Sequence, residues 1–133
     1  MSRFALDTNV LIYLHDSNES NKRQAASKLI TETPVISSQV ISEYLNVCTK
    51  RLKINKQDAL HSLMSWLPYC TLESVVPNTF SEALRLIAKY QFQMFDAIIV
   101  ASALIGNCKL LYSEDMQHNL LVDKKLRIIN PFI

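Results

Sequence analysis

The stretch FALDTNVLIYL, residues 4–14, determines how this chain begins to fold. Phe4–Leu6 is short and apolar, as expected for a buried strand. The polar side chains of Asp7–Asn9 follow and favour a turn or a helix cap. Val10–Leu14 then continues as an apolar helix. The chain therefore opens with a strand, a turn that carries a carboxylate, and a helix.

Strands and helices alternate along the rest of the chain. Short apolar segments predict further strands at 34–36, 71–76, 109–112 and 126–129. Apolar residues at helical spacing predict helices at 20–31, 38–52, 55–67 and 77–88. Residues 94–107 are apolar on nearly every side, which predicts a helix buried at the centre of the molecule. This alternation implies an α/β fold, a three-layer α/β/α sandwich with a central parallel sheet.

The composition fits one domain. The chain has 133 residues, 49% of them apolar, and can bury a core without disulfides. Residues 1–133 show no repeat, low-complexity tract or linker, so we expect a single domain. Gly106 is the one glycine. Phosphate loops of the Walker and dinucleotide-binding kinds need several glycines, so these sites are excluded.

The cysteines and the apolar runs indicate the compartment. Cys48, Cys70 and Cys108 are widely spaced in apolar stretches, as is typical of free thiols in a reducing environment. The apolar run near the N-terminus, 10–14, is too short for a signal peptide, and the run at 97–106 is too short to span a membrane. We therefore expect a cytoplasmic protein with no membrane partner.

Lone carboxylates interrupt three of the apolar segments. Asp7, Glu43 and Asp96 are each the only charged residue in a long apolar stretch. A buried ionised carboxylate must be hydrogen-bonded, paired or neutralised by a cation. Asp7 directly follows the first strand, and Asp115 follows the strand at 109–112. Glu43 and Asp96 fall in the first turns of two predicted helices. Since the carboxyl ends of parallel strands share one edge, all four acids can meet there.

Such a cluster needs compensation. Two carboxylates about 4 Å apart repel by roughly 4 kcal/mol at an effective dielectric constant near 20. A divalent cation supplies the compensation, and ligands that are all oxygen favour Mg²⁺ or Mn²⁺ over zinc. Such an ion can activate water and neutralise charge as a phosphodiester is cleaved. The alternative is that each acid has only a local role, at a turn, a helix N-terminus or a loop.

A combination of segments extends over the whole chain: LDTNVLI at 6–12, SE at 42–43, FDA at 95–97 and YSEDM at 112–116. Together they resemble the PIN-domain nucleases, particularly the VapC-like toxins of bacterial toxin–antitoxin pairs. The resemblance implies a three-layer α/β/α fold and a metal-dependent endoribonuclease. It also implies Mg²⁺ or Mn²⁺ as cofactor, and products with a 5′-phosphate and a 3′-hydroxyl.

The resemblance also gives roles to single residues. The catalytic residues that it implies are Asp7, Glu43, Asp96 and Asp115. We predict that Asp7, Asp96 and Asp115 hold the metal, and that Glu43 helps to ligate it or positions the attacking water. Asn9 would orient the first acid, and the hydroxyl of Ser113 would support the site. Asn119 is a departure, because relatives often have glycine at that place.

The implied partners are an RNA substrate, a cognate VapB-like antitoxin and a second copy of the chain in a homodimer. The antitoxin tail would lie across the groove and send a basic side chain into the acidic site. Candidates for lining that groove or the dimer interface are Trp66, Tyr69, Phe92, Met94 and Phe95. Ordinary core packing is the alternative for these side chains.

The formal charge of +2 neither requires nor excludes a nucleic-acid partner. Basic residues form two clusters, one with Lys50, Arg51, Lys53 and Lys56 and the other with Lys124, Lys125 and Arg127. Either can meet phosphates if it lies beside the cleft, and the alternative is a solvated face. We name Lys50, Arg51 and Lys53 as candidate RNA contacts.

Other functions remain open from the residues alone. Asp7 after a first strand also suits an aspartyl-nucleophile phosphohydrolase, although Asn9 stands where such enzymes have a second aspartate. A non-catalytic module whose acidic cleft docks a basic segment is another alternative. His118 lies near Asp115 in the sequence, but we expect a surface loop histidine rather than a general base.

Overall fold

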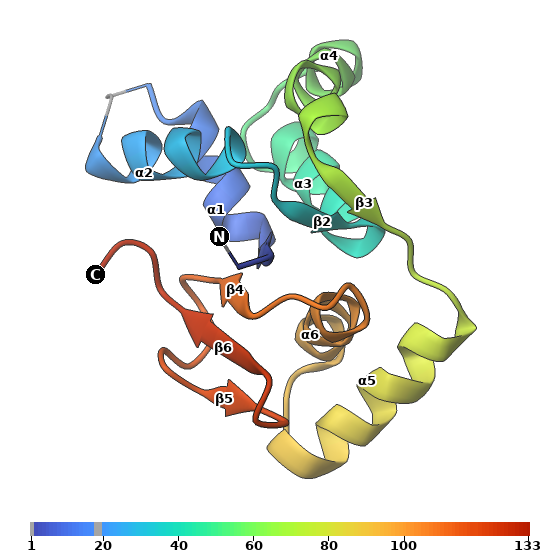
Figure 1. Cartoon of the computed structure of the whole chain (residues 1–133). Helices are drawn as coiled ribbons and strands as arrows, with labels where there is room; N and C mark the ends of the chain where they lie inside the picture. Colours follow the sequence, from blue (N-terminus) through green and yellow to red (C-terminus); the bar gives the residue numbers. More distant parts are fainter. Residues whose placement is uncertain (1, 18–19) are drawn as a thin grey trace.

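The computed structural model describes residues 2–17 and 20–133, and its sheet has the strand order β3-β2-β1-β4-β6-β5 (Figure 1). The strands are β1 (Phe4–Leu6), β2 (Val35–Ser37), β3 (Thr71–Glu73), β4 (Leu110–Tyr112), β5 (Leu121–Val122) and β6 (Leu126–Ile129). All neighbours pair in parallel except β5, which runs antiparallel to β6. The predicted strands are confirmed, although β3 is shorter than expected.

Strand β5 is an element that the apolar pattern does not predict. It forms a hairpin with β6 through Asp123, Lys124 and Lys125, and the first two of these residues have φ angles of 52° and 57°. Two successive left-handed residues are the mark of a type I′ hairpin turn, which usually contains Asn-Gly or Asp-Gly. Because Asp-Lys is an unusual sequence for that turn, the sequence does not predict the hairpin.

The helices are α1 (Thr8–Ile12), α2 (Asn21–Ile30), α3 (Ser38–Lys50), α4 (Lys56–Trp66), α5 (Pro77–Tyr90) and α6 (Met94–Ile105), with short 3-10 turns η1 (Tyr13–His15) and η2 (Leu67–Tyr69). Their ends follow local chemistry. Ser20, Ser37 and Asn55 each accept a backbone N–H and so cap α2, α3 and α4. Pro77 begins α5, where the N–H that proline lacks is not needed. Helix prediction from caps and spacing is thus confirmed.

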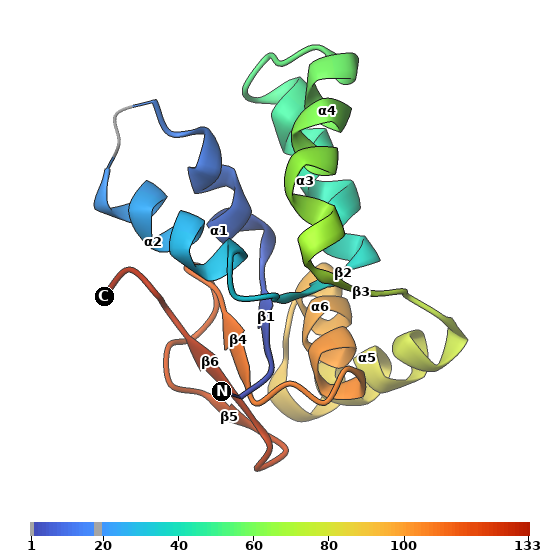
Figure 2. The same ribbon diagram turned by 45° about the horizontal axis from the view of Figure 1, so that its top comes forward.

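The order of the strands reverses beside β1. The chain moves from β1 to β2 to β3 in one direction, and α5 and α6 then carry it back to β4 on the other side of β1. Right-handed crossovers place these two sets of connections on opposite faces. Figures 1 and 2 both show α1 and α2 on one side of the sheet and α5 and α6 on the other. The result is the predicted three-layer sandwich, in which the direction of the chain reverses between β1 and β4, the place where α/β sheets usually bind ligands.

Helix α6 forms the centre of the core. Every residue from Ala97 to Ala103 is buried, as the apolar pattern predicts. Gly106 ends the helix, where a Cβ would lie 3.2 Å from the carbonyl oxygen of Ser102. All 3 cysteines are free. Among the helices of the described residues, none is both long and apolar enough to cross a membrane.

Candidate active site

Asp7 lies at the carboxyl end of β1, beside β4. It is the residue after β1 and the N-cap of α1, and only 5% of its surface is exposed. Its Oδ1 accepts the backbone N–H of Thr8 at 2.7 Å, and its Oδ2 accepts the hydroxyl of Ser113 at 2.8 Å. Ser113 follows β4 directly, so the two neighbouring strands meet at this carboxylate.

Asn9 joins two of the predicted acids. Its Nδ2 donates to Oδ2 of Asp7 at 3.3 Å and to Oδ2 of Asp115 at 3.1 Å. Its Oδ1 accepts the backbone N–H of Glu114 at 3.0 Å. The predicted contact between Asn9 and the first acid is therefore present, and it extends to the loop after β4.

Glu43 and Asp96 approach from two helices. Asp96 lies in the first turn of α6, as predicted, where the positive end of the helix dipole favours a carboxylate. Glu43 lies one turn deeper in α3 than predicted, because Ser37 caps this helix and Ser38 begins it. It still reaches the cluster, where the hydroxyl of Thr8 donates to its Oε2 at 3.5 Å.

The carboxylates feel one another's charge. The pKa of Asp7 is raised to about 6, mainly by burial and then by the charges of Asp96 and Asp115. The hydrogen bonds from Ser113 and Thr8 act in the opposite direction and lower this pKa. Burial, with the charge of Asp7 next, also raises the pKa of Glu43. Burial and the charge of Asp115 raise the pKa of Asp96. The four predicted site residues therefore form one electrostatic cluster, the carboxylate cluster.

The cluster has the chemistry of a metal site. In the part of the chain that the structure describes, no ion pair involves any of its members. In those same residues, no three acidic, histidine or cysteine side chains are placed tightly enough to hold one ion as they stand. The donors nevertheless fit a hard divalent cation, since all are oxygens, and burial followed by the neighbouring carboxylates raises the pKa values of Asp7, Glu43 and Asp96.

A second set of contacts holds the loop that carries Asp115, and the sequence analysis missed it. Oε2 of Glu114 accepts Nζ of Lys22 at 2.6 Å, and Oε1 accepts the hydroxyl of Tyr13 at 2.7 Å. The ring of Tyr13 packs edge-on against Phe132, with ring centroids 4.9 Å apart. Nothing in the spacing of these residues announces the contact, because each lies on a different element.

The candidate RNA contacts lie at a distance from the cluster. Lys50 ends α3, and Arg51 and Lys53 follow it, all three exposed. Lys50 stands seven residues beyond Glu43, which corresponds to about 10 Å along the helix axis. Lys50 therefore lies about two helical turns beyond Glu43, and RNA contact by Lys50, Arg51 and Lys53 stays a prediction.

The apolar candidates divide into two groups. Trp66 is a core residue, 7% exposed and stacked edge-on against Tyr44, so its predicted interface role is wrong. Phe92 is half-buried against Tyr90. The exposed ones are Tyr69, Met94 and Phe95, at 71%, 59% and 50%. Met94 and Phe95 directly precede Asp96 and so stand next to the carboxylate cluster.

The loop after Asp115 contains His118 and Asn119, two residues that the sequence singles out. Nδ1 of His118 accepts the backbone N–H of Asn130 at 2.9 Å, and the ring is exposed. This agrees with a surface loop histidine. Asn119 adopts a left-handed conformation with φ of 70°. Asparagine tolerates this conformation better than most residues, so the loop keeps a shape that glycine would also take.

Comparison with known proteins supports these findings. Residues 4–121 match the family model of the PIN domain. No curated protein sequence gives a significant match. A toxin–antitoxin complex from Klebsiella pneumoniae contains a similar structure, with a TM-score of 0.70, 20% identity and coverage of 98% of both chains.

Two further solved structures share the fold. A DNA-bound VapBC complex from Salmonella typhimurium has a TM-score of 0.71 at 16% identity, covering 96% of this chain and 97% of that one. The sarcin–ricin loop cleaving toxin VapC20 of Mycobacterium tuberculosis has a TM-score of 0.67 at 16% identity, covering 84% and 89%. Since the family model matches most of the sequence, this chain belongs to the PIN domain family, as the sequence analysis predicts.

Proposed function

We propose that this protein is a metal-dependent endoribonuclease and the toxin of a toxin–antitoxin pair. The observation that carries the proposal is the carboxylate cluster at the carboxyl ends of β1 and β4, which has no ion-pairing cation among the described residues. Carboxylates of this kind at the switch point of an α/β sheet suit chemistry on a phosphate group held by a divalent ion. Membership of the PIN domain family supports the same activity.

Asp7, Asp96 and Asp115 would hold the ion, which we infer to be Mg²⁺ or Mn²⁺. When bound, such an ion supplies an activated water and neutralises the charge that develops on the phosphate. Ser113 and Thr8 donate hydrogen bonds that favour the ionised form of Asp7, which is the form that binds a cation. Asn9 holds Asp7 and Asp115 in a fixed relation.

Glu43 has a separate task. Its pKa is raised by burial and by Asp7, so it can accept a hydrogen bond from water and take up a proton more readily than an ordinary glutamate. We infer that Glu43 positions the attacking water for in-line hydrolysis. The products would carry a 5′-phosphate and a 3′-hydroxyl.

The toxin role rests on the shape of the molecule. The solved structures with this fold include toxins in complex with antitoxins and DNA. We infer a VapB-like antitoxin whose basic side chain enters the carboxylate cluster, a homodimer, and action on RNA in the cytoplasm. Met94 and Phe95 are exposed beside Asp96 and offer apolar contacts for the antitoxin tail.

The test uses the purified chain and its Asp7→Asn variant with total cellular RNA, with Mg²⁺, with Mn²⁺ and with EDTA. We expect new 5′-phosphate ends that require the cation and disappear in the variant. A variant that cleaves fully in saturating Mg²⁺ would contradict the role of Asp7. Cation binding without cleavage of any RNA would leave a binding module whose acidic cleft docks a partner.

A further inference from the structure

Basic residues line the edge of the sheet opposite the carboxylate cluster. Arg3, Lys109 and Lys125 each stand directly before a strand, namely β1, β4 and β6. Strand β4 pairs with both of the others in parallel, so the three residues lie near one another at the amino ends. Neighbouring strands are about 4.8 Å apart. We call Arg3, Lys109 and Lys125 the amino-edge row.

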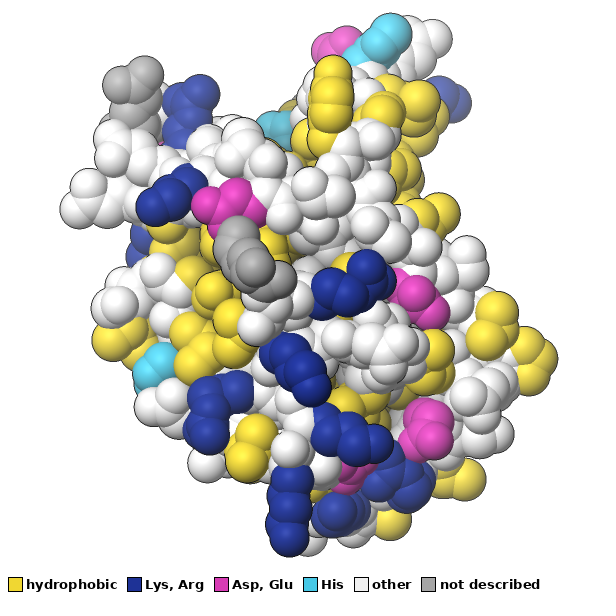
Figure 3. All heavy atoms as spheres, viewed as in Figure 1, with side chains coloured by type: hydrophobic (Ala, Val, Ile, Leu, Met, Phe, Trp, Pro, Cys, Tyr) yellow, Lys and Arg dark blue, Asp and Glu magenta, His cyan; other side chains and the backbone are white. Residues whose placement is uncertain are grey.

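The charge of this row is largely uncompensated. All three side chains are exposed, and none is in an ion pair within residues 2–17 and 20–133. The carboxylate of Asp123, nearby in the hairpin turn, already pairs with Arg85 and Lys89. Figure 3 shows lysine and arginine side chains gathered over the region of β4, β5 and β6. A surface of this kind attracts a polyanion.

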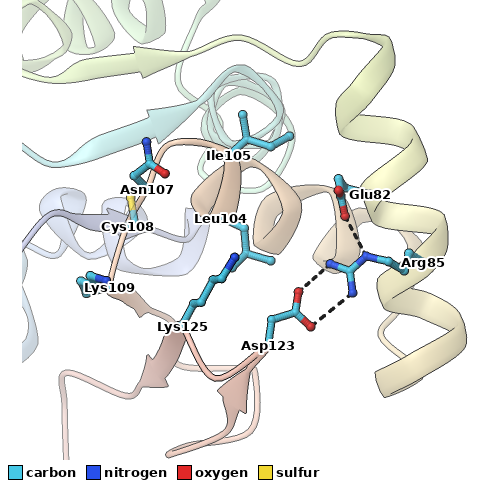
Figure 4. A pocket seen from close by; sticks show the side chains of 9 residues that line it. All are labelled: Glu82, Arg85, Leu104, Ile105, Asn107, Cys108, Lys109, Asp123 and Lys125. Atoms are coloured by element: carbon cyan, nitrogen blue, oxygen red, sulfur yellow. Dashed lines mark hydrogen bonds and ion pairs between the residues drawn. The ribbon is translucent and has the colours of Figure 1, made fainter.

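A cavity opens beside the row. Its volume is about 380 Å³. Its lining includes the cations Arg85, Lys109 and Lys125, the carboxylates of Glu82 and Asp123, the amide of Asn107 and apolar Leu104 (Figure 4). Figure 4 shows the side chain of Lys125 extending into this cavity, while Arg85 is turned toward Asp123 at its other side. Ligand pockets measure about 300–1,000 Å³. Arg85 pairs with both carboxylates, so Lys109 and Lys125 are left to meet the phosphates of a nucleotide unit, beside an amide and an apolar wall.

The carboxylate cluster makes a remote anchor useful. Its own negative charge opposes the approach of a phosphate chain, so attraction must come from elsewhere on the surface. Arg3 and Asp7 are four residues apart along one strand, a distance of about 13 Å. A folded or long RNA can therefore contact both edges of this small sheet.

We propose that the amino-edge row, with the cavity beside it, binds the phosphate backbone of RNA at a distance from the cleavage site. The choice of RNA as ligand rests on the proposed function. The row attracts the RNA and holds a distal segment, while the carboxylate cluster acts on another segment of the same molecule.

The test measures binding of a fluorescent single-stranded RNA to the full chain in EDTA, between about 50 and 200 mM KCl. Each phosphate contact contributes about 0.7 to the slope of log K against log salt concentration for a single strand. Lys109→Gln/Lys125→Gln should reduce that slope by about 1.4 and weaken binding at the low-salt end. Lys28→Gln, which removes one charge from an exposed position on α2, is the matched control for each single variant, Lys109→Gln and Lys125→Gln.

The outcomes separate cleanly. Wild-type slope in Lys109→Gln/Lys125→Gln, or a loss in Lys28→Gln equal to that in each single variant of the row, would overturn the proposal. A polyglutamate peptide that competes for the row as well as RNA does would also overturn it. Because the assay contains no divalent cation and reads no cleavage, its result is independent of the nuclease test. Loss of slope with no RNA cleavage under any condition would refute the proposed function alone.

Discussion

The side-chain amide of Asn9 lies 3.1 Å from Oδ2 of Asp115, although the two residues are 106 positions apart. The contact joins the first turn of α1 to the loop after β4. It is possible because β1 and β4 are neighbours in the sheet. One neutral side chain thus sets the separation of two carboxylates that would otherwise repel each other.

Asn9→Ala should reduce RNA cleavage by about 10–100-fold, the usual cost of losing a residue that orients a metal ligand. The reason is that Asp115 and Asp7 lose a common donor. Cleavage rate and Mn²⁺ affinity are measured side by side, and both should fall. Asn46→Ala, on the exposed face of α3, serves as control. Full activity and unchanged Mn²⁺ affinity in Asn9→Ala would show that the bridge has no role in the site.

Asp7→Asn should stabilise the protein at about pH 7 when no divalent cation is present. The pKa of Asp7 is raised from 3.8 to about 6, so the folded state binds a proton that the unfolded state has lost between these values. Stability therefore falls as pH rises through this window and stays lower above it. The pKa difference corresponds to at most about 3 kcal/mol, and we expect a gain of about 1–3 kcal/mol.

Urea unfolding in EDTA measures that gain. At about pH 4 the two proteins should unfold at similar urea concentrations. The carboxyl of Asp7 is then protonated in the folded protein and only partly ionised in the unfolded protein, so little of the difference remains. Addition of Mg²⁺ should stabilise the wild type more than the variant. An Asp7→Asn protein that is less stable than the wild type at neutral pH would mean that the carboxylate is not strained by its surroundings.

Ser113→Ala should move the acidic limb of the pH–rate profile to higher pH, by about one unit. The Ser113 hydroxyl donates to Oδ2 of Asp7 and lowers the pKa of that carboxyl, so its removal lets the pKa of Asp7 rise further. Ser102→Ala is the matched control, because Ser102 is also buried but donates to the carbonyl of Ile98. Identical acidic limbs in wild type and Ser113→Ala would exclude this role.

Asp123→Asn should destabilise the fold by about 1 kcal/mol at neutral pH and low salt, after allowance for solvent screening. Hydrogen bonds from Arg85, first among the causes, lower the pKa of Asp123 from 3.8 to about 2. The stabilisation is thus present above about pH 4 and is lost as pH falls toward 2. Thermal unfolding at low and high KCl measures it, and the difference should shrink with salt.

We expect the Lys22–Glu114 contact to affect the rate of RNA cleavage more than the stability of the fold. The pair is partly exposed, so Lys22→Ala alone should lower the stability of the fold only slightly. Cleavage should fall further than this cost explains, because Glu114 adjoins Asp115 and its N–H is bonded to Asn9. A double-mutant cycle of Lys22→Ala and Glu114→Gln on cleavage rate tests this. Strictly additive losses would indicate that the contact does not position the loop.

Local sequence determined most of the elements of this protein. Ser37 and Asn55 cap helices by accepting hydrogen bonds from backbone groups two or three residues away. The apolar sequence of α6 favours a buried helix, whichever elements pack around it. Such interactions act over a few positions, so their pattern is visible in the chain itself. The same holds for the lone acids, because an unpaired charge in an apolar stretch stands out without any structure.

Tertiary structure alone decided which of these groups meet. The bridge from Asn9 to Asp115, the contact of Lys22 with Glu114 and the row of Arg3, Lys109 and Lys125 all depend on the order of strands in the sheet. The β5–β6 hairpin depends on a turn whose left-handed conformation is not predicted by its sequence. Contacts across the sheet are set by which strands pair and in what register, and no spacing along the chain encodes that choice.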